Sequence, residues 1–356
     1  MGDEHIRVLA YPAYQSADEN PYITDLYEAV RTDGISVDDY TRRGLLRRYN
    51  IIHIHWPEQL VEWRRGPFYA TADAAKVLAL LAAAKAQGTK LVWTGHDLGP
   101  HDMPHPRIYR AYVATFMRFV DLLISLDQAS IPQLLDRYPR LRKTSLCVIP
   151  HSHYRNGYPH PPTRKAARER LRLPGQTRVL LLLGRVKRYK RIDSLIQGYA
   201  ERGSNGFRLI VVGREAEYDP DYAIEVSRAA LNAGPNVEVR LGAVPATEVP
   251  TWHAAADVVV LPYARTTALH SGAALLALSL HTPIVVTDTP TMRELAATVG
   301  TGWVHLSNGT IDDTLRVAEL AADSRPPGPP DLSNLDPGNL GRETAQSYRT
   351  LVDGFT

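Results

Sequence analysis

Short apolar runs alternate with helical patterns along the 356 residues of the chain. Most runs are apolar at every position, as expected for strands that helices cover on both faces. The predicted strands are Ile6–Ala10, Ile51–His55, Leu91–Thr94, Leu122–Ser125, Leu146–Ile149, Val179–Leu183, Leu209–Val212, Val237–Leu241, Val258–Leu261 and Ile284–Val286. A helical pattern between them runs from Thr71, a residue type that caps helix starts, to Gly88, a residue type that ends helices. This alternation predicts parallel sheets built from strand–helix–strand units.

A stretch rich in Pro, Gly and His at residues 150–163 separates the strands into two sets. We therefore predict an α/β fold of two Rossmann-like domains, residues 1–160 and 161–335, with parallel sheets that face each other across a cleft. Residues 325–339 are rich in proline and are predicted to be neither helix nor strand. A last helical pattern, Leu340–Val352, lies in a terminal segment of residues 336–356.

Composition narrows the class of protein only a little. Hydrophobic residues make up 44% and charged residues 22%, which is ordinary for a soluble domain. The 41 Lys and Arg against 38 Asp and Glu are too balanced to indicate a nucleic-acid partner. The single cysteine, Cys147, excludes an intrachain disulfide, and we expect it to be buried. No window approaches the roughly 20 apolar residues of a membrane span, so we expect a cytoplasmic protein.

Cations gather after the predicted strand Val179–Leu183. Gly184 and Arg185 follow the strand, and three more basic residues precede a helix that begins near Ile192: Lys187, Arg188 and Lys190. A strand end that leads into a helix is where doubly wound sheets bind ligands, and converging cations there could hold a diphosphate. A solvated basic loop explains the same residues.

A second anion site is predicted at Ser271-Gly272, which opens the apolar run Ala273–Leu280 before Pro283 and the next strand. A helix start presents unpaired N–H groups and the positive end of the helix dipole, which suit a pyrophosphate. The run contains no carboxylate.

Together these segments resemble the GT-B glycosyltransferases. The resemblance rests on Gly184-Arg185 with Lys190, on LIVVG ending at Gly213, and on Ser271-Gly272 with TPIVV after it, in matching order over residues 178–298. It implies a hexosyltransferase whose C-terminal half binds a GDP- or UDP-linked sugar, and whose last helix crosses back to an N-terminal, acceptor-binding domain. The nucleotide sugar is a co-substrate, and no cofactor is expected.

The resemblance also implies roles for single residues. Arg185 and Lys190 match the pair that grips the donor diphosphate, beside Gly184 and the amides of Ser271-Gly272. Arg214 falls where the base or ribose lies, although an exposed loop arginine is an equal interpretation.

Two glutamates of retaining family members are missing around Ser271-Gly272. Their places fall at Leu269 and Ala277, or at Leu276 when the segment is aligned on Pro283, and His270 is the nearby side chain of comparable reach. The segment is more similar to a divergent inverting group that includes β-mannosyltransferases of bacterial exopolysaccharide assembly. ENPYITDLYEAV, IIHIHWPE, LVWTGHDLGPHD and VIPHSHY look like the N-terminal pattern of that group. This second resemblance predicts inversion.

An inverting transfer needs a base for the acceptor hydroxyl. Four titratable residues follow the strand Leu91–Thr94: His96, Asp97, His101 and Asp102. We favour Asp102 and then Asp97 as the base, with His96 facing the donor; helix or turn capping also explains Asp97. Asp25 and Glu58 are less favoured candidates for the base.

No catalytic metal is predicted. His53 and His55 share one face of a strand, but without a third ligand we interpret them as polar lining of the cleft. The sequence DPD at 219–221 fits a turn and a helix cap.

A basic segment in the N-terminal half bears on the acceptor. TRRGLLRRY at 41–49, with Trp63, Arg64 and Arg65, is basic and partly apolar, which suits peripheral contact with an anionic lipid surface or a phosphorylated acceptor. A solvated charged face, with a glycan or small-molecule acceptor, is equally open. Two other functions remain: a hydrolysing nucleotide-sugar 2-epimerase and a noncatalytic nucleotide-sugar-binding protein.

Overall fold

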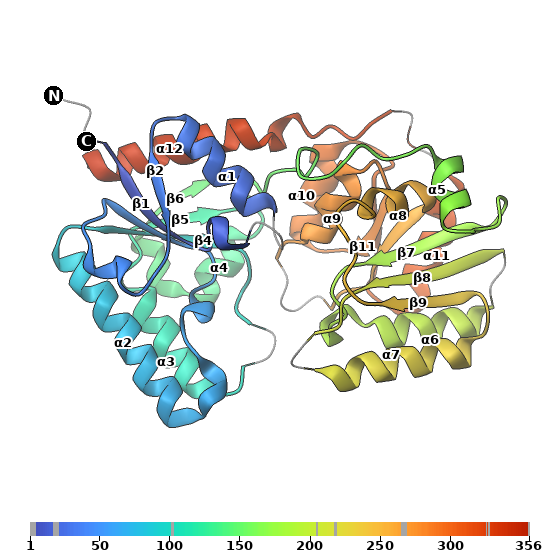
Figure 1. Ribbon diagram of the computed structural model, residues 1–356, viewed down its shortest axis with the longest axis horizontal. Coiled ribbons are helices and arrows are strands. Elements are labelled where there is room, and N and C mark those ends of the chain that lie inside the picture. The colour runs from blue at the N-terminus through green and yellow to red at the C-terminus, as the bar shows by residue number, and fades with distance from the viewer. Residues whose placement is uncertain are drawn as a thin grey trace. The chain divides into compact units, whose positions relative to one another are not determined.

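The chain folds into two units, each with its own parallel sheet (Figure 1). The computed structural model describes residues 5–16, 21–100, 103–203, 206–216, 219–264, 269–324, 326 and 328–354. Unit 1 comprises Met1–Ser152 and Ser333–Thr356, and unit 2 comprises His153–Leu332. The two six-stranded parallel sheets confirm the predicted α/β class with two Rossmann-like halves. The division falls after Ser152, earlier than the predicted boundary at residue 160.

The sheet of unit 1 has the strand order β2-β1-β3-β4-β5-β6. Its strands are β1 (Arg7–Tyr11), β2 (Ser36–Asp39), β3 (Ile51–Ile54), β4 (Lys90–Gly95), β5 (Leu122–Ser125) and β6 (Ser145–Val148). Its helices are α1 (Pro21–Thr32), α2 (Pro67–Ala86), α3 (Pro106–Phe116), α4 (Ile131–Arg137) and α12 (Pro337–Asp353). The chain passes from β1 to one side and then returns to β3 on the other. The carboxyl ends of β1 and β3 are therefore the expected place for a ligand.

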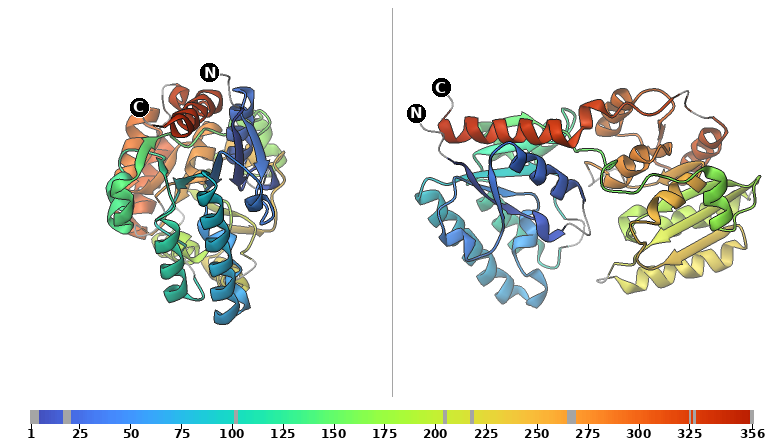
Figure 2. Two further views of the ribbon diagram at one scale, coloured as in Figure 1. Left: turned by 90° about the vertical axis from the view of Figure 1, so that its left-hand side faces the viewer. Right: turned by 45° about the horizontal axis from the view of Figure 1, so that its top comes forward.

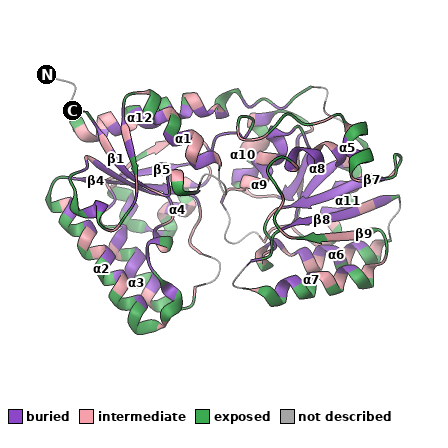
Figure 3. Cartoon of the chain, viewed as in Figure 1, coloured by how far each residue is buried: buried purple, intermediate pink, exposed green. Residues whose placement is uncertain are grey.

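The sheet of unit 2 has the order β12-β11-β10-β7-β8-β9. Its strands are β7 (Arg178–Leu183), β8 (Phe207–Gly213), β9 (Val237–Leu241), β10 (Val258–Leu261), β11 (Ile284–Thr287) and β12 (Val304–Ser307). Its helices are α5 (Arg164–Arg170), α6 (Ile192–Arg202), α7 (Pro220–Ala233), α8 (Val249–Ala255), α9 (Gly272–Ser279), α10 (Pro290–Val299) and α11 (Ile311–Asp323). Figure 3 shows its central strands buried. Here the switch in strand order lies between β7 and β10.

Two strands, β2 and β12, were not predicted. Their sequences, SVDD and VHLS, carry polar residues, and both strands lie at an edge of their sheet. An edge strand is covered less than a central one, so it shows no continuous apolar run. The sequence also predicted a buried Cys147, but this residue is half-buried because it lies on the edge strand β6.

The terminal helix α12 begins at Pro337, so the prediction of no helix in residues 325–339 was wrong at the end of that segment. Asp336 caps the helix by accepting a hydrogen bond from the Asn339 amide at 3.0 Å, and proline suits the first helical position. The helix packs against α1 (Figure 2), where a Cβ on Gly341 would lie 2.2 Å from the Cβ of Ala29. The helix thus belongs to unit 1.

Helix α2 departs from two predictions. It begins at Pro67 rather than at Thr71, whose hydroxyl donates to the Pro67 carbonyl at 2.8 Å. Its 20 residues are also long and apolar enough to cross a membrane, and it is the one such helix in the described part of the chain. The high mean hydropathy of α2 comes from its many alanines, which count as apolar although their side chains are small. One face of α2, with Val77 and Leu81, is buried in unit 1.

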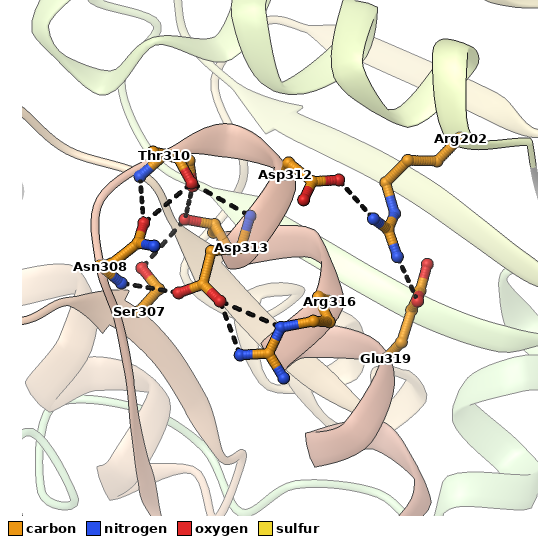
Figure 4. Close-up of polar contacts among 9 residues, drawn as sticks. Arg202, Ser307, Asn308, Thr310, Asp312, Asp313, Arg316 and Glu319 are labelled. Atoms are coloured by element: carbon orange, nitrogen blue, oxygen red, sulfur yellow. Dashed lines mark hydrogen bonds and ion pairs between the residues drawn. The ribbon is translucent and has the colours of Figure 1, made fainter.

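The start of α11 shows how strongly local contacts hold unit 2 (Figure 4). Thr310 Oγ1 accepts from the Asp313 amide at 3.2 Å, and Asp313 in return accepts from the Asn308 amide at 2.7 Å. Arg202 of α6 binds Glu319 of α11 at 3.0 Å. The helix cap, the hydrogen bond from Asn308 and the ion pair give the polar cluster a structural explanation.

Candidate functional site

The turn after β7 is held by the neighbouring strand β8. Gly184 donates its N–H to the Val212 carbonyl at 2.9 Å, and Val186 donates to the Arg214 carbonyl at 2.9 Å. A Cβ on Gly213 would lie 2.0 Å from the Gly184 carbonyl oxygen, so only glycine allows this approach. The backbone that carries Arg185 is therefore tightly positioned.

Lys190 is a buried cation aimed at this turn. Its side chain is only 6% exposed, and its Nζ lies 5.5 Å from the ring centre of Tyr263. A Cβ on Gly184 would lie 3.0 Å from the same Nζ, so the amine reaches the turn itself. Burial, with the charges of Lys187 and Arg185, lowers the pKa of the Lys190 amine to about 7. An arriving anion would relieve that cost, which makes this edge suited to a phosphate.

The other predicted cations differ in their surroundings. Arg188 pairs with Asp219 at 2.7 Å and with Glu225 at 2.8 Å, so carboxylates already neutralise its charge. Asp219 stands at the N-cap position of α7 as predicted, but its carboxylate binds Arg188 and caps nothing. Arg185 and Arg214 are exposed.

Helix α9 begins beside the same sheet edge. Ser271 caps it by accepting from the Ala274 amide at 3.2 Å. A Cβ on Gly272 would lie 2.9 Å from the hydroxyl of Tyr154, so this glycine brings a phenol to the helix start. His270 and Ser271 line a pocket together with apolar and hydroxyl side chains: Leu261, Tyr263, Val286, Thr287, Thr289 and Met292. Its lining supplies hydrogen-bonding groups and no carboxylate.

The positions of the missing glutamates are apolar and mostly buried. Leu269 is 2% exposed and Ala277 is fully buried, while Leu276 is half-buried. Buried apolar side chains at these positions offer no group that binds a sugar hydroxyl. His270 is half-buried and remains the polar side chain next to the turn.

In unit 1 the ends of β3 and β4 are joined by histidines and tyrosines. His53 contacts Tyr348 at 2.6 Å through Nδ1 and Thr94 at 2.7 Å through Nε2. Tyr27 contacts the rings of both His53, at 3.0 Å, and His55, at 2.8 Å. Burial lowers the pKa of His53 to about 3 and that of His55 well below its ordinary value, so both are neutral. The prediction that His53 lines a cleft was wrong, because the ring is fully buried between α1, α12 and the sheet.

His96 continues this network. A hydrogen bond of 2.8 Å joins His55 Nδ1 to His96 Nε2, and the His96 ring stacks on Trp56 with 4.5 Å between ring centres. Tyr22 of α1 stacks on His151 at 3.7 Å. No group of three His, Cys, Asp or Glu able to hold a metal occurs among the residues with described positions.

Two carboxyl side chains line a small pocket at the same edge. Glu58 follows β3, Asp97 follows β4, and aromatic side chains complete the lining: Trp56, Trp93, Tyr109 and Tyr138. Burial, and then the charge of Asp97, raise the pKa of Glu58 to about 7. From the sequence, Glu58 was only a less favoured candidate for the base. Its position directly after a strand end already indicated that it lies at the ligand-binding edge of the sheet.

Asp25 is not among the described residues that line this pocket. Asp102, with His101, lies outside the described residues. Asp25 is on α1; burial raises its pKa, and its Oδ2 has no hydrogen-bond partner in the described ranges. Trp63, predicted in a basic surface patch, is buried and donates its indole N–H to the Glu58 carbonyl at 2.6 Å.

Comparison with known proteins agrees with this arrangement. A family model for glycosyl transferases group 1 matches residues 177–319. The chain is 30% identical to the GDP-mannose:glycolipid 4-beta-D-mannosyltransferase of Xanthomonas campestris pv. campestris, over 98% of this chain and 93% of that enzyme. This chain belongs to the GT-B glycosyltransferases. It is a hexosyltransferase that uses a nucleotide sugar.

Solved structures share the fold of this glycosyltransferase. HepE of Anabaena, in complex with UDP, has a TM-score of 0.64 at 15% identity and covers 97% of this chain and 100% of its own. Sucrose-phosphate synthase from Thermosynechococcus elongatus has a TM-score of 0.63 at 16% identity and covers 98% of this chain and 96% of its own.

Proposed function

We propose that this glycosyltransferase transfers a hexose from a GDP- or UDP-linked sugar, with inversion, to a hydroxyl of a glycan or lipid-linked acceptor. The observation that carries the proposal is the buried Lys190 amine, which reaches the Gly184 turn at the switch point of unit 2. A buried amine with no carboxylate paired to it in the described ion pairs is stabilised by an anion.

In this proposal the diphosphate binds Arg185, Lys190 and the amides at the start of α9. His270 contacts the transferred sugar, and Arg214 contacts the base or ribose. GDP-mannose is the first donor to test, because the Xanthomonas relative is named for it. UDP-sugars come second, because HepE was solved with UDP.

Inversion is supported by the apolar residues where retaining relatives carry glutamates. Buried Leu269 and Ala277 offer no carboxylate to the donor sugar. The acceptor oxygen would then attack the anomeric carbon directly, and a carboxylate of unit 1 would take its proton. The sequence favoured Asp102 and then Asp97 as this base, with His96 beside the donor, and Glu58 is a further carboxyl of unit 1.

The test begins with a panel of GDP- and UDP-sugars, each scored for thermal stabilisation of the protein. The stabilising donor is then incubated with lipid-linked oligosaccharides, and the one-bond C–H coupling at the new anomeric centre gives the stereochemistry. A β-linked product from an α-linked donor is expected, and an α-linked product would exclude inversion. Donor consumed without any acceptor would favour the epimerase. Tight binding without turnover would favour a noncatalytic protein.

We also propose that the face around α2 contacts an anionic membrane. Five arginines there are exposed: Arg43, Arg47, Arg48, Arg64 and Arg65. Next to them in the chain, Leu46, Phe68 and Tyr69 are 65%, 81% and 61% exposed. Basic residues with exposed aromatic groups suit anionic headgroups, at about 1 kcal/mol for each cation.

Vesicle co-sedimentation tests this contact. Binding to vesicles with 30% phosphatidylglycerol is expected, and binding to pure phosphatidylcholine is not. Phe68→Ser with Tyr69→Ser should weaken it several-fold. The matched control is Leu231→Ser, which changes an 84% exposed leucine of unit 2. Equal binding to both vesicle types would contradict the proposal.

A further inference from the structure

The carboxyl group of Glu58 takes no part in the hydrogen bonds and ion pairs described for unit 1. It lies in the short 3-10 turn Pro57–Leu60 after β3 and is half-buried. No hydrogen bond or ion pair joins its carboxylate to another residue of the described ranges. Its backbone, in contrast, is held: Trp63 Nε1 donates to the Glu58 carbonyl at 2.6 Å, and Tyr112 donates to the Pro57 carbonyl at 2.9 Å. A rigid turn therefore holds an uncommitted carboxyl.

The pocket that contains Glu58 has a second unused polar group. Trp93 of β4 is 3% exposed, and its indole Nε1 is a buried donor without a partner among the described residues. Trp93 and Glu58 line the same pocket. A buried donor is normally satisfied, so an orphan donor beside an uncommitted carboxyl points to a ligand that brings oxygen atoms.

The size of the pocket suits a single hydroxyl group of a sugar. Its volume is about 10 Å³, and Trp56, Tyr109 and Tyr138 present aromatic rings around it. A space of this size admits one hydroxyl, whose oxygen can accept a hydrogen bond from the buried indole N–H. The pocket lies at the carboxyl ends of β3 and β4, the ligand-binding edge of a parallel sheet.

We propose that Glu58 is the base that takes the proton of the acceptor hydroxyl, while Trp93 Nε1 donates to the oxygen of the same hydroxyl. The inference rests on the proposed inverting transfer. The acceptor O–H bond breaks, and its proton moves to the Glu58 carboxylate. The acceptor oxygen forms the bond to the anomeric carbon, and the bond from that carbon to the diphosphate oxygen breaks, with its electrons leaving on the nucleoside diphosphate.

The surroundings of Glu58 match this role. The titratable groups that face it come from several elements: Tyr11, His55, His96, Asp97, Tyr109 and Tyr138. Burial raises the pKa of the three tyrosines and lowers that of His55, so these groups are neutral near pH 7. Asp97 contributes the charge that adds to burial in raising the pKa of Glu58 to about 7. A base with a pKa near the working pH combines availability with proton affinity.

The experiment compares Glu58→Gln, Asp97→Asn and Asp102→Asn with the full-length wild-type enzyme. Glu58→Gln should lower kcat by ~10²–10⁴, the range for a positioned base, while donor-induced thermal stabilisation stays unchanged. Asp97→Asn should keep most of the activity and move the acidic limb of the kcat/KM profile to lower pH, because the raising charge is gone. Glu58→Asp should restore part of the loss. Glu62→Gln, an exposed glutamate four positions later, is the matched control and should resemble wild type.

Three outcomes would overturn the proposal. The first is Glu58→Gln activity within about threefold of wild type at every pH. The second is loss of turnover in Asp97→Asn or Asp102→Asn with Glu58→Gln active, which places the base after β4. The third is a wild-type enzyme that consumes donor without glycosylating an acceptor; this result removes the proposed function itself and is recognised before any variant is compared.

Discussion

The ligand-binding edges of the two units have the same architecture and opposite chemistry. Each unit has a six-stranded parallel sheet in which the order of strand addition reverses beside a central strand. The candidate site residues follow the ends of the strands at that point. Unit 2 places cations and a helix start there, with Lys190 buried under the Gly184 turn. Unit 1 places neutral imidazoles, aromatic rings and the carboxyl groups of Glu58 and Asp97 there.

This difference matches the proposed division of work, in which unit 2 binds the donor diphosphate and unit 1 binds the acceptor. A buried amine disfavours its own charge, so unit 2 gains by binding an anion. A buried carboxyl holds its proton more tightly, so unit 1 gains by accepting one near neutral pH. Desolvation therefore shifts both groups, Lys190 and Glu58, to a pKa of about 7 from opposite sides.

The largest expected effect is a loss of stability on disrupting the close contact between Gly184 and Gly213 in unit 2. Gly213→Ala places a Cβ 2.0 Å from the Gly184 carbonyl, so β7 and β8 must separate. We expect a loss of at least about 3 kcal/mol in stability, measured by urea unfolding. Gly175→Ala, where a Cβ meets nothing within 4 Å, is the control. Equal midpoints for the two variants would show that the turn adapts.

The next effect concerns the affinity of unit 2 for the diphosphate of the donor. Lys190→Ala and Arg185→Ala should each weaken donor binding by about 1.5–3 kcal/mol, the value of a hydrogen bond to a charged group, as measured by calorimetry. Arg188→Ala should change it little, because Asp219 and Glu225 already neutralise Arg188. Unchanged binding in the first two variants would remove both residues from the donor site.

Burial of the Glu58 carboxyl should make the free energy of unfolding of the protein depend on pH. The folded pKa of Glu58, about 7, exceeds its ordinary value of 4.5, so its contribution to stability is lost as pH rises between these values. Glu58→Gln cannot ionise, and it should match wild type at pH 4 and exceed it by roughly 1–3 kcal/mol at pH 8. Thermal melts at both pH values measure this. A variant less stable than wild type at pH 8 would contradict an ionised, desolvated Glu58.

The smallest effect is the pH dependence of donor binding. The free Lys190 amine has a pKa of about 7 and must be charged to bind a diphosphate. Donor affinity should therefore fall about fivefold from pH 7 to pH 8, as the protonated fraction falls. Lys190→Arg keeps its charge, so its affinity for a nucleotide sugar should stay level over that range. Identical slopes for the two proteins would mean that the amine is not the partner of the anion.

Much of the fold was readable from local sequence. The continuous apolar runs predicted the central strands within one or two residues, because a strand buried on both faces has apolar residues at each position. Ser271-Gly272 predicted the start of α9, because a cap and a small residue suit that role locally. The edge strands β2 and β12 were missed, since partial exposure leaves no such run.

The chemistry of the candidate site was decided by tertiary structure. The sequence by itself determined that Lys190 and Arg188 follow the same strand, but only packing buries one above Tyr263 and pairs the other with Asp219 and Glu225. It placed Glu58 after a strand without showing that Trp93 and Asp97 share its pocket. Strand and turn patterns depend on neighbours within a few positions. Burial, pairing and pKa depend instead on the distances between side chains that the chain brings together from remote segments.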